Sequence, residues 1–285
     1  MLVVTGATGQ LGHLVIDALL KYVAASDIVA AVRNVEKAQD LADKGVHVRF
    51  ADYTQPESLV TAFEGATKVL LISSSEVGQR FAQHKAVVDA AKNVGAELLA
   101  YTSILDATNS PLALAQEHKQ TEAYIAESGV PAAILRNGWY SENYVNGIGA
   151  SLEHGAMFGC AGEGKIASAP RADYAEAAAQ VLTQPDQVGK VYELAGDEAF
   201  TLGEFADYLS ALSGQTVVYN NVSEDEYANI LKQVGLPAPL AETLANSETG
   251  AAKGGLFDDS QTLSKLIGRP TETIETTLKH ALAAR

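Results

Sequence analysis

The stretch Thr5-Gly6-Ala7-Thr8-Gly9-Gln10-Leu11-Gly12 decides the fold, because it joins the apolar run Leu2–Thr5 to a segment whose apolar residues recur at helical spacing. Gly6 permits a tight turn, Gly9 omits a side chain where a pyrophosphate would lie, and Gly12 lets the helix pack closely on the strand. The first amides of such a helix, together with its dipole, attract phosphate. We therefore predict a dinucleotide-binding turn formed by Gly6, Ala7, Thr8, Gly9, Gln10 and Leu11. The alternative is an ordinary strand–helix turn with small residues.

Short apolar runs alternate with helical segments through the first 136 residues. The runs are Leu2–Thr5, Ile28–Val32, and residues 46–50, 68–72, 97–102 and 132–136. Strands that are apolar at every position are buried on both faces, which is typical of a parallel sheet covered by helices. Strand and helix in strict alternation form right-handed crossovers. The sequence thus predicts an α/β fold with a doubly wound, parallel, six-stranded Rossmann sheet in residues 1–136.

In residues 137–285 strands and helices no longer alternate. We therefore predict a smaller mixed α/β region there, which binds the substrate and is partly interleaved with the sheet. Thr201 and Glu204 form a capping-box pattern at the start of a predicted helix that reaches residue 212. The other predicted elements are helices at 173–182, from Ser223 and near Leu240, and strands at 190–194 and 217–219. Residues 247–255 are polar and glycine-rich, so we expect a mobile loop there.

The composition narrows the class of protein. With 47% hydrophobic and 19% charged residues the chain is globular rather than disordered, and its net charge of −15 disfavours a nucleic-acid partner. The longest apolar run, Ile28–Val32, is too short to cross a membrane, and the early glycine turn leaves no room for a signal peptide. We therefore expect a cytoplasmic protein without a membrane partner. Cys160 is the only cysteine and the six histidines lack ligand spacing, so we expect no metal.

Two features indicate which dinucleotide binds. Arg33 directly follows the run Ile28–Val32, where NAD-specific sites carry an acid for the ribose 2′-hydroxyl. A guanidinium is suited to a 2′-phosphate, so we predict NADP(H); the alternative is an ordinary surface arginine. Ser73, Ser74 and Ser75 follow another run at the sheet edge where ligands bind, so their hydroxyls and amides are expected to contact the ribose and diphosphate. Asp52 and Tyr53 are weaker candidates for flanking the adenine.

Besides the glycine turn and Arg33, the chain carries Tyr101-Thr102-Ser103, Leu135-Arg136-Asn137-Gly138-Trp139-Tyr140-Ser141-Glu142-Asn143, and the segments 165–173 and 253–259. In this combination it resembles the NmrA-like, atypical branch of the short-chain dehydrogenases, and within it the bacterial quinone-reducing members. The resemblance extends over essentially the whole chain and implies NADPH-dependent reduction of a quinone by hydride transfer without flavin. It also implies that the nicotinamide is held by a loop over which Ser168 closes, formed by Asn137, Gly138, Trp139, Tyr140, Ser141 and Glu142.

The side chains of this loop agree with that role. Trp139 and Tyr140 offer flat apolar faces, whereas Asn137 and Ser141 offer amide and hydroxyl partners. The alternative for Trp139 is a place in the core between domains. Tyr140 and Asn143, with the expected mobile loop at 247–255, predict a quinone pocket with a lid.

The chain lacks the catalytic pair of ordinary short-chain dehydrogenases. Those enzymes use Tyr-x-x-x-Lys, in which lysine lowers the tyrosine pKa for proton donation, but none of the 11 tyrosines here has lysine four residues later. The corresponding positions are Leu114, His118 and Glu122, so ketone reduction is disfavoured. A reduced quinone is a delocalised anion that takes its proton from water, which leaves proximity as the main catalytic device. His118 either donates a proton, bonds the ribose or contacts the substrate, or it is a surface histidine without a role.

Two alternatives stay open at this point. One is the same hydride chemistry on another acceptor, such as a cationic triphenylmethane dye. The other is a regulatory protein that senses NADP(H) without turnover. The sequence fits either a monomer or a homodimer.

Overall fold

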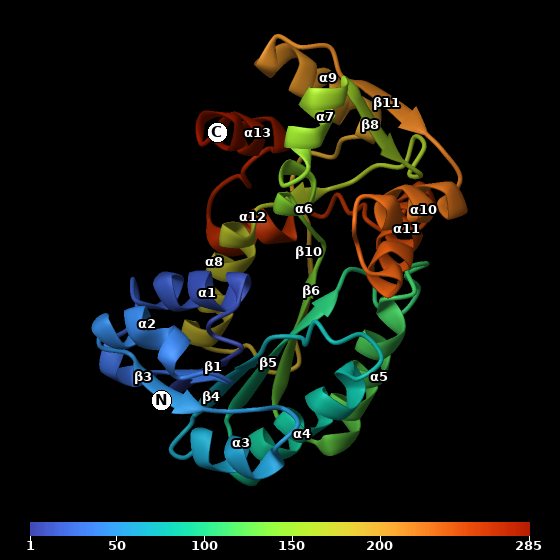
Figure 1. Ribbon diagram of the computed structural model, residues 1–285. Helices are drawn as coiled ribbons and strands as arrows, with labels where there is room; N and C mark the ends of the chain where they lie inside the picture. Colours follow the sequence, from blue (N-terminus) through green and yellow to red (C-terminus); the bar gives the residue numbers. More distant parts are fainter. The chain divides into compact units, whose positions relative to one another are not determined.

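The computed structural model describes residues 1–285, and the chain forms two compact units, each built from separate segments (Figure 1). Unit 1 comprises Met1–Ile104, Glu117–Asn137 and Arg171–Tyr192. Unit 2 comprises Leu105–Gln116, Gly138–Pro170 and Glu193–Arg285. No helix combines the length and the apolar character that a bilayer crossing requires.

A seven-stranded sheet, in the order β10-β6-β5-β4-β1-β2-β3, forms the centre of unit 1, and the second half of its edge strand β10 is counted with unit 2. Its strands are β1 (Leu2–Thr5), β2 (Ile28–Val32), β3 (His47–Phe50), β4 (Lys68–Leu71), β5 (Leu98–Ile104), β6 (Ala132–Asn137) and β10 (Val191–Leu194). Each pairing from β3 across to β6 is parallel, as in Leu2 opposite both Ile28 and Lys68. The predicted α/β Rossmann fold is therefore confirmed. The expected number of six strands is wrong, because β10, predicted as a strand outside the sheet, joins it beside β6.

Helices cover both faces of this sheet (Figure 1). They are α1 (Gln10–Leu19), α2 (Gln39–Asp43), α3 (Pro56–Ala62), α4 (Arg80–Asn93), α5 (Ala115–Ser128) and α8 (Arg171–Thr183), with short 3-10 turns at Ala25–Asp27 and Glu36–Ala38. Alternate strand residues such as Val3 and Val29 join the buried cluster of Phe63 and Val87, which come from the α3–α4 side. Helices α1 and α8 pack against each other. Burial on both faces explains why the strands are apolar throughout.

Unit 2 is mixed α/β with two small parallel pairs, β11 with β8 and β7 with β9. Its strands are β7 (Trp139–Tyr140), β8 (Ala156–Gly159), β9 (Ser168–Ala169) and β11 (Val218–Asn221). Its helices are α6 (Glu142–Val145), α7 (Ile148–His154), α9 (Leu202–Ser213), α10 (Glu224–Gln233), α11 (Ala238–Ala252), α12 (Thr262–Ile267) and α13 (Ile274–Ala283). The capping box that opens α9 is confirmed: Glu204 N donates to Thr201 Oγ1 at 3.1 Å, and Thr201 N donates to Glu204 Oε2 at 2.7 Å.

The mobile loop expected at 247–255 is wrong, because α11 continues through Ala252. Ser247 is only 1% exposed, and Gly250 is also buried. A Cβ on Gly250 would lie 2.7 Å from Leu112 Cδ1. The small and polar residues of this segment do not make it mobile. They let the end of α11 pack closely against its surroundings.

Candidate cofactor site

The glycine turn connects β1 to α1 with the geometry that its glycines predict. Gly6 has a φ of +60°, in the left-handed region that favours glycine. A Cβ on Gly12 would lie 2.3 Å from Gly6 O, so only glycine allows the helix to approach the turn this closely. Gly9 is the N-cap residue of α1, with ordinary extended backbone angles and no side-chain cap. The first turn of α1 also carries no acidic residue. Its first amides, which lack acceptors within the helix, therefore suit an anion.

Thr5 and Tyr53 tie together three strand ends beside this turn, an arrangement that the sequence alone did not reveal. Thr5 Oγ1 lies 2.5 Å from Tyr53 Oη and donates to Leu70 O at 2.9 Å. Tyr53 Oη in turn donates to Ile72 O at 2.9 Å, and burial raises the pKa of this phenol. The Tyr53 hydroxyl thus fixes the sheet edge, which leaves only its ring for the expected contact with adenine.

Arg33 lies at the carboxyl end of β2, as predicted, and its side chain is 67% exposed. Its guanidinium Nη1 contacts Glu76 Oε1 at 2.8 Å. The sequence places no acid next to Arg33, but the structure brings one from the loop after β4. This pairing was missed because Glu76 follows Arg33 by 43 positions in the chain.

The serine loop after β4 uses two of its amides within the protein. Ser73 N donates to Thr102 Oγ1 at 2.9 Å, and Ser74 N donates to His84 Nε2 at 2.9 Å. Ser74 Oγ accepts a hydrogen bond from Glu76 N at 3.1 Å. Since these amides are already bonded, the hydroxyls are what Ser73 and Ser74 can offer a cofactor. Ser75 is exposed.

A buried polar network lies behind this loop. Because His84 Nε2 accepts from Ser74 N, its proton is on Nδ1, which donates to Thr121 Oγ1 at 2.9 Å. Tyr101 Oη lies 2.7 Å from His118 Nδ1, and Arg80 Nη1 lies 3.3 Å from His118 Nε2. Burial, and then the charge of Arg80, lower the pKa of both His84 and His118 to about 3. Both imidazoles are thus neutral at neutral pH.

These contacts overturn one of the two interpretations of His118. It is 5% exposed and hydrogen-bonded, so it is not a surface histidine. Glu122, one helical turn further along, is paired with Arg136: its carboxylate oxygens lie 3.0 Å from Arg136 Nε and 2.7 Å from Arg136 Nη2. Leu114 is partly buried. His118 and Glu122 are therefore bonded to other residues of unit 1, whereas Leu114 belongs to unit 2.

The loop expected to hold the nicotinamide begins where β6 ends. Asn137 is buried at the end of this strand, within unit 1. In unit 2, Ser141 N donates to Ala169 O at 3.0 Å, and Ser141 Oγ lies 2.9 Å from Ser168 Oγ. The structure thus places Ser168 beside this loop, and its contact with a nicotinamide stays a prediction. Trp139, Tyr140 and Glu142 are partly buried and Asn143 is exposed. In the same unit, Gly138 N donates to Leu194 O at 2.7 Å.

Comparison with known proteins places the chain in a family. The NmrA-like family matches residues 1–281. Quinone oxidoreductase 2 of Escherichia coli (strain K12) is 58% identical over 280 residues, which are 98% of each chain. The structure of the NADPH-dependent quinone oxidoreductase of Escherichia coli complexed with NADPH superposes with a TM-score of 0.97 at 57% identity, covering 99% of this chain and 100% of that one. Citrobacter sp. triphenylmethane reductase complexed with NADP(H) gives 0.95 at 44% identity, with the same coverage. The chain belongs to the NmrA-like family.

Proposed function

We propose that this protein is an NADPH-dependent quinone reductase that transfers hydride from the nicotinamide to a quinone without flavin. The observation that carries the proposal is the 58% identity to the Escherichia coli quinone oxidoreductase over 98% of both chains. The geometry supports the cofactor half independently. A glycine turn with φ +60° at Gly6 leads into a helix that has neither a side-chain cap nor an acid in its first turn. These residues fit a diphosphate.

The residues that would hold the cofactor follow from this geometry. The stretch Gly6 to Leu11 would bind the diphosphate through backbone amides, and Arg33 would bind the 2′-phosphate. The hydroxyls of Ser73, Ser74 and Ser75 would bind the ribose side. The nicotinamide would be held by Ser168 and the loop Asn137, Gly138, Trp139, Tyr140, Ser141 and Glu142. Bound NADPH supplies the hydride.

The quinone would contact Tyr140 and Asn143, one partly buried and one exposed at the start of α6. His118 would not contact the quinone, because it is buried and lies 2.7 Å from Tyr101 Oη. No Tyr-x-x-x-Lys dyad exists to deliver a proton. The residues therefore act by binding and orienting donor and acceptor, and the hydroquinone anion takes its proton from water.

A second acceptor class is favoured by one observation. The Citrobacter sp. triphenylmethane reductase is 44% identical with a TM-score of 0.95. A cationic dye accepts hydride at carbon without a proton donor, so the absence of the dyad suits it equally well. Quinone reduction is preferred because the identity to the quinone oxidoreductase is higher.

The test is turnover with a panel of acceptors. The purified protein, free of visible flavin absorbance, is mixed with NADPH and benzoquinone, menadione or a triphenylmethane dye, and the loss of NADPH absorbance is followed. We expect oxidation with the quinones and none without an acceptor. Binding of NADPH by fluorescence titration without oxidation in any mixture would contradict the proposal and favour a regulatory protein. Oxidation with the dye alone would favour the second acceptor class.

A further inference from the structure

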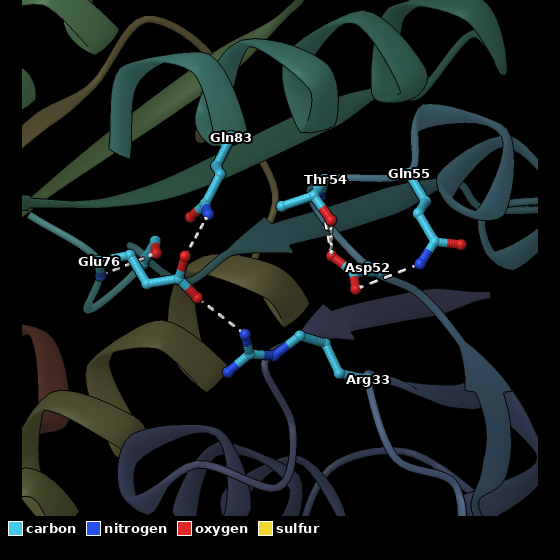
Figure 2. Close-up of polar contacts among 7 residues, drawn as sticks. Arg33, Asp52, Thr54, Gln55, Glu76 and Gln83 are labelled. Carbon is cyan, nitrogen blue, oxygen red and sulfur yellow. Dashed lines mark hydrogen bonds and ion pairs between the residues drawn. The ribbon is translucent and has the colours of Figure 1, made fainter. Parts of the chain in front are cut away.

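Glu76 is bonded to the guanidinium of Arg33, the group that we propose binds the 2′-phosphate of the cofactor. Its Oε1 accepts a hydrogen bond of 2.8 Å from Arg33 Nη1, although the two residues come from different strand ends (Figure 2). Their side chains are 43% and 67% exposed, respectively. Arg33 is therefore accessible to a ligand, but its charge is already paired.

The Glu76 carboxylate is anchored from its other side. Gln83 Nε2 donates to Glu76 Oε2 at 2.8 Å, and Gln83 is only 5% exposed on α4. The Glu76 backbone amide is fixed by Ser74 Oγ at 3.1 Å. Figure 2 shows the carboxylate between Gln83 and Arg33, bonded to both. An exposed ion pair usually loses side-chain freedom when it forms, but here Gln83 has already restricted one partner.

Asp52 is a second carboxylate near Arg33, but it is occupied elsewhere. Its Oδ1 accepts from Thr54 N at 2.8 Å and from Thr54 Oγ1 at 2.7 Å, and in Figure 2 no bond joins it to Arg33. Burial opposes its ionisation, yet the hydrogen bonds from Thr54 and the charge of Arg33 keep the pKa of Asp52 below its ordinary value. Glu76 is thus the carboxylate that pairs directly with Arg33.

We propose that Glu76 is a specificity-determining residue that lowers the preference for NADPH over NADH. This inference rests on the proposed role of Arg33. To reach the Arg33 guanidinium, the 2′-phosphate must either displace the Glu76 carboxylate or bind the guanidinium beside it. In both cases the negative charge of Glu76 repels the phosphate. NADH carries a hydroxyl at this position, so neither effect applies to it. Loss of the Glu76 charge should therefore strengthen binding of NADPH selectively.

Glu76→Gln tests this directly, because glutamine keeps the size of the side chain and removes its charge. Calorimetric titration with NADP⁺ and NAD⁺ should show NADP⁺ binding about three- to tenfold tighter than in the wild type, with NAD⁺ changed less than about twofold. The fragment adenosine 2′,5′-bisphosphate should gain as NADP⁺ does. Glu36→Gln is the matched control, since Glu36 is exposed, stands three positions after Arg33 and makes no ion pair. It should change neither affinity by more than about twofold.

Arg33→Ala separates this inference from the proposed function. If Arg33→Ala retains the full preference for NADP⁺, the assignment of the 2′-phosphate to Arg33 fails. If Arg33→Ala loses the preference but Glu76→Gln binds NADP⁺ like the wild type, only the inference on Glu76 is wrong. Weaker NADP⁺ binding by Glu76→Gln also overturns it, because Glu76 would then orient Arg33 for the phosphate. In the double variant Arg33→Ala/Glu76→Gln, the gain from Glu76→Gln should largely vanish.

Discussion

His118 Nδ1 lies 2.7 Å from the phenol oxygen of Tyr101, so this histidine, which we predict to stand where ordinary short-chain dehydrogenases carry a lysine, faces the sheet of unit 1. Arg80 approaches its other nitrogen at 3.3 Å. Burial lowers the pKa of His118 to about 3, and the charge of Arg80 adds to this shift. A neutral imidazole whose nitrogens both face protein groups is poorly placed to protonate a substrate at neutral pH.

His118→Ala should therefore lower kcat by less than about tenfold, or under about 1.4 kcal/mol of transition-state stabilisation. The pH profile of kcat between about pH 5 and 8 should keep its shape, because a group with a pKa of about 3 does not titrate there. Steady-state rates with a quinone provide the measurement. A thousandfold loss of kcat would make His118 a general acid. His118→Asn, whose side-chain amide can still hydrogen-bond to the Tyr101 hydroxyl, controls for damage to the network.

Gly9 and Gly12 should respond differently to substitution. A Cβ on Gly9 would lie 3.1 Å from Gly6 O, which is tight but tolerable, whereas on Gly12 it would lie 2.3 Å from the same oxygen. Gly9→Val should abolish detectable dinucleotide binding with a nearly unchanged Tm, because a branched side chain would cover the first amides of α1. Gly12→Ala should lower Tm through strain between helix and turn.

Thermal unfolding and NADPH fluorescence titration of both variants measure these effects. Unchanged affinity in Gly9→Val would show that the cofactor lies elsewhere. An unchanged Tm in Gly12→Ala would show that the turn relaxes easily.

Local patterns in the sequence predicted individual strands and the glycine turn, because these features depend on residues that are neighbours in the chain. The strand Ile28–Val32 is found at its predicted bounds, and Gly6 adopts the predicted turn, because burial on both faces and a positive φ leave clear signals. The pairing of Arg33 with Glu76 depends on which strand ends are neighbours, which no local pattern encodes. Residues 247–255 were misjudged for a related reason. Gly250 makes close contact with a distant residue, and such a glycine cannot be distinguished in sequence from one in a loop.

Arg33→Ala should remove most of the preference for NADPH. A charge-assisted hydrogen bond contributes about 1.5–3 kcal/mol, so the wild type should prefer NADPH over NADH by roughly ten- to a hundredfold. The variant should show a raised KM for NADPH, with kcat and the NADH kinetics nearly unchanged, because the contact is the same in ground and transition states. Steady-state kinetics with both cofactors measure this. Lys37→Ala is the control, since Lys37 is an exposed cation four positions later. A loss of preference in this control instead would assign the phosphate to Lys37.

Glu248 in unit 2 should make stability depend on pH in a predictable direction. Its Oε2 accepts from Cys160 N at 2.6 Å, Tyr227 donates to it, and the side chain is largely buried. Burial raises its pKa to about 7 from an ordinary 4.5, an effect that the hydrogen bonds from Cys160 and Tyr227 only partly offset. Tyr219 and Tyr144 also face this carboxylate, and both are neutral phenols whose pKa burial raises.

The direction of the pH dependence of stability follows from which state of the protein, folded or unfolded, binds the proton. Between pH 4.5 and about 7 the folded protein holds a proton on Glu248 that the unfolded chain has lost. The stability that this proton provides is complete below pH 4.5, is lost as pH rises to about 7, and changes little above that. Glu248→Gln keeps an acceptor for Cys160 N but carries no charge at any pH. The wild type should therefore lose about 1–3 kcal/mol of unfolding free energy, relative to Glu248→Gln, between pH 5 and pH 8. Urea unfolding at the two pH values measures this difference. Glu242→Gln, on the same helix but 63% exposed, should show a change within about 0.5 kcal/mol. Equal pH dependence in the two variants would mean that Glu248 ionises normally in the folded protein.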